Sequence, residues 1–303
     1  MLMLTAVAAT TAATDGSRSG LLGCSRAERF DADDFPARPL VDNPFLPLVP
    51  GTQLVLRGVS NVVGPTLDHE VVFTVTDLTK RVAGVRSVVA YDVDVSDGEV
   101  TEAELAFFAQ DEDGNVWSLG EYPEEFEDGE FVGAPSTWIA GEDGAEAGVH
   151  MLAAPRVRGL RYLQGRAPEI DFLDCAEVVA DDEVTGVPAG RFTGVLVTEE
   201  TSPLEPDSGS QLKHHAPGLG IVLVTFVDDP EGEVLELADF RVLRPGQLGT
   251  VRREALELDD RAYEVSDVYA STSRAKRLAE DLDAGDRDEE DQAGDDLDED
   301  GHE

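Results

Sequence analysis

The chain has 303 residues, 41% of them hydrophobic, which is enough to build one large domain or two small ones. Acidic residues outnumber basic residues by 64 to 23, and the formal net charge at pH 7 is -41. Because phosphate groups bind to clustered Lys and Arg, this charge excludes nucleic acid as a partner and disfavours anionic lipid headgroups. Only three basic residues are lysines. Adaptation to high salt and a compositional bias toward Arg both stay open as explanations of the acid excess.

Residues 1–16, MLMLTAVAATTAATDG, form an apolar stretch of small residues that is typical of the hydrophobic part of an export signal. The basic residues that usually precede such a stretch are missing. The stretch predicts an extracytoplasmic protein, either secreted or lipid-anchored at the cell surface. No other segment reaches the run of about 18 apolar residues that would span a bilayer.

Residues 21–24, Leu-Leu-Gly-Cys, match the lipobox of bacterial lipoproteins, in which the cysteine is lipidated after cleavage. Asp15 and Arg18 interrupt the apolar run that should precede a lipobox. The chain has one other cysteine, Cys175. Three states of Cys24 therefore stay open: a lipid anchor, one half of a disulfide with Cys175, or an unprocessed residue. Contact with a membrane is expected only through a lipid on Cys24.

Between residues 52 and 243, short runs rich in Val, Leu, Phe and Thr alternate with Gly, Pro and Asp. In the segment 90–95, Tyr91 and Val93 share one face of a strand, opposite Asp92 and Asp94. Dipeptides such as Asp97-Gly98 are typical of hairpin turns. We expect eight to eleven strands without intervening helices. The sequence thus predicts a mainly β fold, a large curved antiparallel sheet or partly open barrel.

The pattern changes after about residue 250. A helix is predicted from about 266 to 282, with Ser266 as its cap, because a Ser side chain can accept a hydrogen bond from an amide of the first turn. The residues beyond it have little apolar surface to bury and repel one another. The predicted organisation is an export leader or disordered segment (1–34), a single β-rich domain (35–250), a helical extension (251–282) and a disordered acidic tail (283–303).

Two motifs carry a family resemblance. Residues 43–52, NPFLPLVPGT, and the pair PLEP (203–206) and APGLG (216–220) resemble segments of a family of uncharacterised bacterial secreted proteins and lipoproteins. The resemblance covers roughly residues 40 to 243. It implies an envelope location and a β-rich fold, and it implies no catalytic residue.

The pair His214-His215 is the first candidate for a metal or catalytic site. Successive side chains of a strand point to opposite faces, so the two histidines cannot bind one metal from the same side. A partner strand at 197–201 would instead place Glu199 or Glu200 near Lys213 as a cross-strand ion pair. We therefore expect a structural role for this hairpin.

The loop 111–115 is a second candidate, because its oxygen ligands at alternate positions suit calcium. It lacks the Gly and the acid that an EF-hand requires at its sixth and twelfth positions, and a tight turn explains the residues more simply. No resident cofactor is expected beyond weakly held calcium. A metal site built from Asp111, Asp113 and His215 stays open as the alternative.

No signature of nucleophilic catalysis or phosphate binding occurs in the sequence, which favours a protein that is not an enzyme. Aromatic residues on the predicted strands could line an apolar binding cavity or simply fill the core. They are Phe107, Phe108, Trp117, Trp138, Phe192 and Phe226. The favoured function is an exported envelope protein that binds an apolar small molecule or another envelope component. The alternative is a metal-dependent enzyme or a calcium-stabilised domain.

Overall fold

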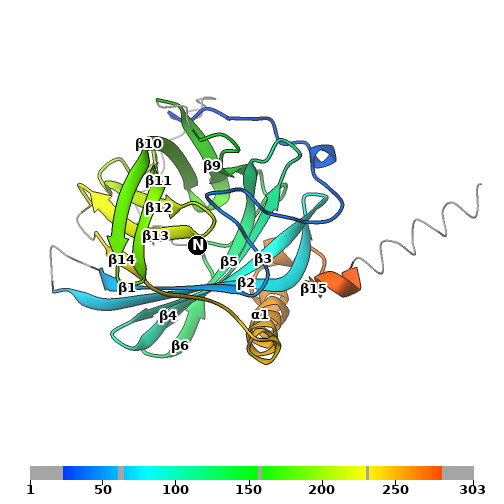
Figure 1. The fold of residues 1–303 in the computed structure, drawn as a ribbon. Helices are drawn as coiled ribbons and strands as arrows, with labels where there is room; N and C mark the ends of the chain where they lie inside the picture. Colours follow the sequence, from blue (N-terminus) through cyan, green and yellow to red (C-terminus); the bar gives the residue numbers. More distant parts are fainter. Residues whose placement is uncertain (1–22, 61–64, 156–158, 230–231, 282–303) are drawn as a thin grey trace, which may run out of the picture.

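The computed structural model describes residues 23–60, 65–155, 159–229 and 232–281 (Figure 1). Within these ranges, fifteen strands form one antiparallel sheet, and twelve of them close into a barrel. The barrel strands, in spatial order, are β1 (Thr52–Ser60), β14 (Val234–Val242), β13 (Gly220–Val227), β12 (Ser210–Ala216), β11 (Gly190–Thr201), β10 (Phe172–Val187), β9 (Arg161–Ala167), β8 (Glu146–Met151), β5 (Val116–Glu127), β4 (Glu99–Gln110), β3 (Val85–Ser96) and β2 (Leu67–Val82).

The barrel closes because β1 pairs with both β14 and β2: Leu54, for example, lies opposite Phe240 on one side and Phe73 on the other. The predicted mainly β, antiparallel fold is confirmed, and the sheet is closed rather than open. The expected number of strands was too low for the described part of the chain. Strands β6 (Glu130–Gly133), β7 (Trp138–Ile139) and β15 (Lys276–Arg277) are too short to show a period of two in the sequence.

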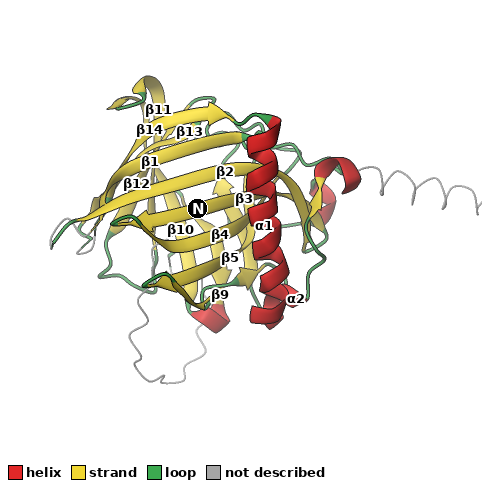
Figure 2. Cartoon of the chain, turned by 90° about the horizontal axis from the view of Figure 1, so that it is seen from below, coloured by secondary structure: helices red, strands yellow, loops and turns green. Residues whose placement is uncertain are grey.

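A long helix, α1 (Pro245–Val265), lies across the outside of the barrel (Figure 2). Its residues Ala255, Leu258 and Ala262, spaced to share one face, pack in the same apolar cluster as Leu105 and Phe107 of β4. This contact identifies which side chains of β4 point outward, and therefore which point into the barrel.

The predicted helix at 266–282 was wrong in position, because α1 ends at Val265. Pro245 stands in the first turn of α1, where a missing amide hydrogen costs nothing. Ser266 nevertheless acts as a cap: its hydroxyl accepts a hydrogen bond from the backbone amide of Tyr269 at the start of the short helix α2 (Asp267–Ala270). The acidic tail predicted at 283–303 lies outside the described residues.

The segment 41–48 covers one end of the barrel. Val41, Leu46 and Leu48 pack against the inward-facing residues Phe108 and Met151. We call this end of the barrel the capped end.

The cap is anchored through Asn43, whose side-chain amide donates to the backbone oxygens of Gly114 (3.0 Å) and Leu152 (3.1 Å). The amide of Gly218 donates to the backbone oxygen of Pro44 at 2.7 Å. The two motifs that carry the family resemblance thus meet at the capped end.

Candidate functional site

The inner face of β3, β4 and β5 carries a wall of carboxyl groups. Because Leu105 and Phe107 point outward to α1, the alternate residues Glu102, Glu104 and Ala106 of β4 point into the barrel. The strand register extends this row sideways to Asp92 and Asp94 on β3 and to Glu121 on β5. The cross-strand pairs are Asp92 with Glu104, Asp94 with Glu102, and Ala106 with Glu121. We call Asp92, Asp94, Glu102, Glu104 and Glu121 the acidic wall.

The same rows become apolar toward the capped end. Moving from the acidic wall toward the capped end, the next inward-facing residue on β3 is Ala90, and the next two on β4 are Ala106 and Phe108. All three belong to the apolar cluster that the cap covers. A second apolar cluster lines the opposite part of the barrel. Its buried members are Leu54, Leu56, Val71, Val195, Ala216, Val222, Val224, Leu235 and Leu237. The interior is therefore amphipathic, apolar at the capped end and over β1, β13 and β14, and acidic on β3 to β5.

Burial and mutual repulsion raise the pKa values of the acidic wall. Burial, reinforced by Glu104 and Asp94, raises the pKa of Glu102 to about 9. Burial, reinforced by Asp92 and Asp94, raises the pKa of Glu104 to about 7. The pKa of Glu121 is raised well above its usual value by burial and by the neighbouring Glu104. Several of these groups thus hold a proton near neutral pH.

Glu121 has one carboxyl oxygen with a hydrogen-bond donor and, within the described structure, one without. Its Oε1 accepts a hydrogen bond from the indole nitrogen of Trp138 at 2.9 Å. Its Oε2 is buried and has no hydrogen-bond partner among the described residues. A buried oxygen left without a partner costs about 1–3 kcal/mol, which is why such atoms are uncommon in structural cores.

A cation already lies at one edge of the acidic wall. The ring nitrogens of His69 lie 3.4 Å from a carboxylate oxygen of Asp94 and 3.0 Å from one of Glu233. Burial alone would lower the pKa of His69, but hydrogen bonding and attraction to Asp94 and Glu233 raise it to about 10. The wall therefore stabilises positive charge where the chain supplies it.

A second polar group lies on β9 to β12. The Nζ of Lys213 is 2.5 Å from Glu200, and Gln164 donates to the other Glu200 oxygen at 3.1 Å. The predicted cross-strand ion pair of Lys213 is confirmed with Glu200 as its partner, but it is buried inside the barrel. Burial lowers the pKa of His215 to about 3 and that of His150 to about 4, so both rings are neutral near pH 7.

The histidine pair divides as the sequence predicted. His215 points inward, is 1% exposed and lies 3.2 Å from the hydroxyl of Thr198. His214 lies on the other face of β12, where its ring nitrogen is 3.5 Å from the hydroxyl of Thr185.

The structure does not assemble the alternative metal site of Asp111, Asp113 and His215. Asp111 and Asp113 lie in the β4–β5 turn, where the carboxylate of Asp111 accepts hydrogen bonds from the backbone of Asn115 (2.8 Å) and from Trp117 (2.7 Å). Across the described ranges, no group of three or more His, Cys, Asp or Glu side chains is placed to hold a metal ion. The tight turn predicted for this loop is confirmed by the left-handed backbone of Gly114.

The six aromatic residues are distributed over different apolar clusters. Phe107, Trp117 and Trp138 belong to the large apolar cluster that also contains Leu258 of α1, Phe108 to the cluster under the cap, and Phe192 to the cluster over β1, β13 and β14. Phe226 of β13 packs against the backbone of Gly232. Phe108 lies at the amphipathic interior, with its ring 5.3 Å from that of His150.

Cys24 is bonded to Cys175 in a disulfide that fixes the amino-terminal segment to β10. Beside it, Ser25 forms a parallel bridge with Tyr162 of β9. A sulfur in a disulfide cannot also carry a thioether-linked lipid. The structure thus contradicts lipidation of Cys24 and agrees with the disulfide among the three states that the sequence left open.

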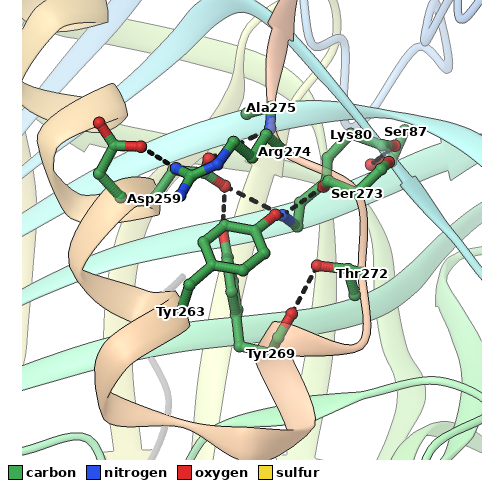
Figure 3. Close-up of polar contacts among 10 residues, drawn as sticks. Lys80, Ser87, Asp259, Tyr263, Tyr269, Thr272, Ser273, Arg274 and Ala275 are labelled. Atoms are coloured by element: carbon green, nitrogen blue, oxygen red, sulfur yellow. Dashed lines mark hydrogen bonds and ion pairs between the residues drawn. The ribbon is translucent and has the colours of Figure 1, made fainter.

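A buried ion pair between Lys80 and Asp259 lies on the outside of the barrel, beneath α1 (Figure 3). The Nζ of Lys80 contacts Asp259 (2.9 Å), the hydroxyl of Tyr263 (2.9 Å) and the backbone oxygen of Ser273 (2.8 Å). It also lies 4.0 Å from the ring centroid of Tyr269. We call this arrangement the Lys80 cage. Burial lowers the pKa of Lys80 to about 8, although Asp259 opposes this shift.

Comparison with known proteins gives a fold likeness and no family. The sequence matches no protein-family model, and no curated protein matches it. Two solved structures are similar over two thirds of this chain. One, from Bacteroides fragilis, is a protein proposed to be exported, with a YmcC-like fold (15% identity, TM-score 0.36, covering 65% of this chain and 98% of that one). The other is a proposed lipoprotein of Parabacteroides distasonis (14% identity, TM-score 0.38, covering 66% of this chain and 99% of that one). At these TM-scores neither likeness bears on function.

None of the helices in the described part of the chain has the length and apolar character needed to cross a bilayer.

The acidic wall was missed by sequence reasoning, although one signal for it was present. The sequence predicts that Asp92 and Asp94 lie on the opposite face of a strand from Tyr91 and Val93, and β3 has this arrangement. The acids, however, face the barrel interior, and Asp92 is only 4% exposed. Tyr91 and Val93 lie outside with Leu258 of α1, around a surface hollow of about 450 Å³. Alternation alone cannot reveal which face of a strand is covered by a distant helix.

Proposed function

We propose that this protein is an exported, non-enzymatic binding protein of the cell envelope that takes up an amphipathic small molecule inside its barrel. The observation that carries the proposal is the amphipathic interior of a closed twelve-stranded barrel. Eight strands already give a barrel interior that side chains just fill or that holds one small ligand, and the diameter grows with the number of strands. Apolar rows at the capped end would hold an apolar body, while the acidic wall would face its polar end.

Export is supported by two features of the chain. The apolar, small-residue stretch at residues 1–16 is typical of an export signal. The disulfide between Cys24 and Cys175 suits an oxidising compartment, because the cytosol keeps most thiols reduced. The resemblance to secreted proteins and lipoproteins agrees with this location.

Native mass spectrometry of the full chain, freshly purified after expression in a bacterial host, tests the proposal. We expect a non-covalent adduct that survives treatment with a chelator and disappears when the protein is denatured. A protein mass without any adduct would contradict the proposal if the protein also failed to bind dodecanol and dodecylamine added in excess. A stoichiometric metal lost on chelation, with loss of the fold, would favour the calcium-stabilised alternative instead.

A further inference from the structure

The carboxyl groups of the acidic wall restrict the charge that a ligand can carry. The wall's five carboxyl groups come from three adjacent strands: Asp92 pairs with Glu104 and Asp94 with Glu102, while Glu121 lies opposite Ala106, diagonal to Glu104. Like charges this close cannot all ionise, and the raised pKa values of Glu102, Glu104 and Glu121 follow from that repulsion together with burial. A bound cation would offset the repulsion among the carboxylates, since it supplies opposite charge. It would also offset the cost of their burial, since it supplies hydrogen-bond donors.

Glu121 provides an independent sign of a binding position. Its Oε1 is held by Trp138 at 2.9 Å, which fixes the carboxyl group, while Oε2 is buried without a partner among the described residues. Glu121 lies opposite Ala106, which places it on the same face of the sheet as Glu104. An oriented, unpartnered acceptor beside further carboxyl groups suits an ammonium or guanidinium donor.

Two basic side chains of the described interior already have acidic partners. His69 is already engaged by Asp94 and Glu233 (3.4 and 3.0 Å), and Lys213 is engaged by Glu200 (2.5 Å). Neither of these two cations forms an ion pair with Glu102 or Glu121 in the described structure.

From this geometry we infer that the acidic wall, through Glu121 at its edge nearest the capped end, binds the amine or guanidinium group of a cationic amphiphile whose apolar part lies toward the capped end. This inference rests on the proposed function and specifies the chemical class of its ligand. An anionic amphiphile such as a fatty acid is disfavoured, because each carboxyl group of the wall that ionises repels it.

The test uses three probes of equal chain length, dodecylamine, dodecanol and dodecanoate, titrated into the full chain below their micelle concentrations. Isothermal calorimetry measures each dissociation constant. We expect dodecylamine to bind at least about tenfold more tightly than dodecanol, and dodecanoate to bind most weakly, since a charge-assisted hydrogen bond is worth about 1.4 kcal/mol or more.

Substitutions in the acidic wall test where the amine of dodecylamine binds. E121Q keeps an oxygen for Trp138 but removes the charge, and it should weaken dodecylamine about tenfold or more while leaving dodecanol unchanged. E102Q should have a smaller effect in the same direction. The matched control is E127Q, on the same strand but exposed, which should leave all three dissociation constants unchanged. Thermal unfolding of each variant checks that the fold is kept.

The outcomes separate the two proposals. Equal binding of dodecylamine and dodecanol in the unchanged protein would overturn the cation inference while the binding function stands. Binding of dodecylamine that E121Q and E127Q weaken equally would also overturn it, because the amine would then be attracted by the overall acidity. Failure of all three probes, with no adduct in native mass spectrometry, would overturn the proposed function itself.

Discussion

Lys80 and Glu121 are both buried ionisable residues on strands of the same barrel, one facing outward beneath α1 and the other facing inward. Lys80 has a carboxylate, a hydroxyl and a backbone oxygen within 2.9 Å, and an aromatic ring below it. Glu121 has one donor, acidic neighbours and an oxygen without a partner in the described structure. A buried ionisable residue can therefore be fully paired within the fold, as Lys80 is, or keep a polar atom without a described partner, as Glu121 does. Lys80 is fully paired between β2, α1 and the segment that follows α2, while Glu121 keeps one buried oxygen without a partner among the described residues.

The Lys80 cage should give the largest effect, and in the destabilising direction. Asp259→Ala leaves the ammonium group of Lys80 buried without its counter-charge, a change that costs about 3–5 kcal/mol in comparable sites. Urea unfolding at pH 7 measures this loss. The control is Asp260→Ala, on the next residue, whose ion pair with Arg274 is exposed and worth at most about 1 kcal/mol. Similar losses in the two variants would contradict the structural role of the Lys80 cage.

The pH dependence of stability tests the edge of the acidic wall. The pKa of His69 is about 10 in the folded protein and 6.5 in its unfolded reference. The folded state therefore binds more protons between these values. The stabilisation is fully present below pH 6.5 and is lost as the pH rises through about 10. We expect a loss of about 2–4 kcal/mol from this residue.

Urea unfolding from pH 6 to pH 10, with His69→Gln for comparison, isolates this contribution. The variant is needed because Glu102, with a pKa of about 9, weakens the protein in the same direction as the pH rises. The pKa of Lys80, lowered to about 8, acts in the opposite direction between pH 8 and pH 10.5. A slope that is identical in the two proteins would show that His69 is not protonated in the folded state.

Substitution in the acidic wall should raise the free energy of unfolding, whereas substitution in the Lys80 cage should lower it. Glu102→Gln removes a buried acid from a group of acids, and we expect the ligand-free protein to gain about 1–2 kcal/mol at pH 8. The gain should shrink toward pH 5, where the unfolded chain also begins to take up the proton. Chemical denaturation at both pH values measures it, with Glu127→Gln as the exposed control. Destabilisation at pH 8 would mean that Glu102 has a structural partner.

The smallest effect is expected at the helix cap beside the Lys80 cage. Ser266→Ala removes the hydroxyl that accepts from the amide of Tyr269 and should cost about 0.5–1 kcal/mol. Ser266→Thr keeps the hydroxyl and should restore most of the stability. Differential scanning calorimetry compares the two variants, and equal melting temperatures would show that the cap does not support Tyr269.

The fold class was predictable from local patterns, because period-two alternation and Asp-Gly turns are written in consecutive residues. The division of His214 and His215 and the ion pair of Lys213 were predictable for the same reason, since both follow from strand geometry. The end of α1 was misplaced, because Ser266 caps the short helix α2 that follows it. The acidic wall was out of reach, because it depends on which face of β4 the helix α1 covers, a contact between residues more than a hundred positions apart.

The most direct test of the account is a crystal structure of the full chain grown with dodecylamine. We expect the alkyl chain inside the barrel toward the capped end, with the amine nitrogen about 3 Å from Oε2 of Glu121. Density for dodecylamine on the outer surface alone, with the interior closed by side chains, would contradict the claim that the acidic wall is a binding site.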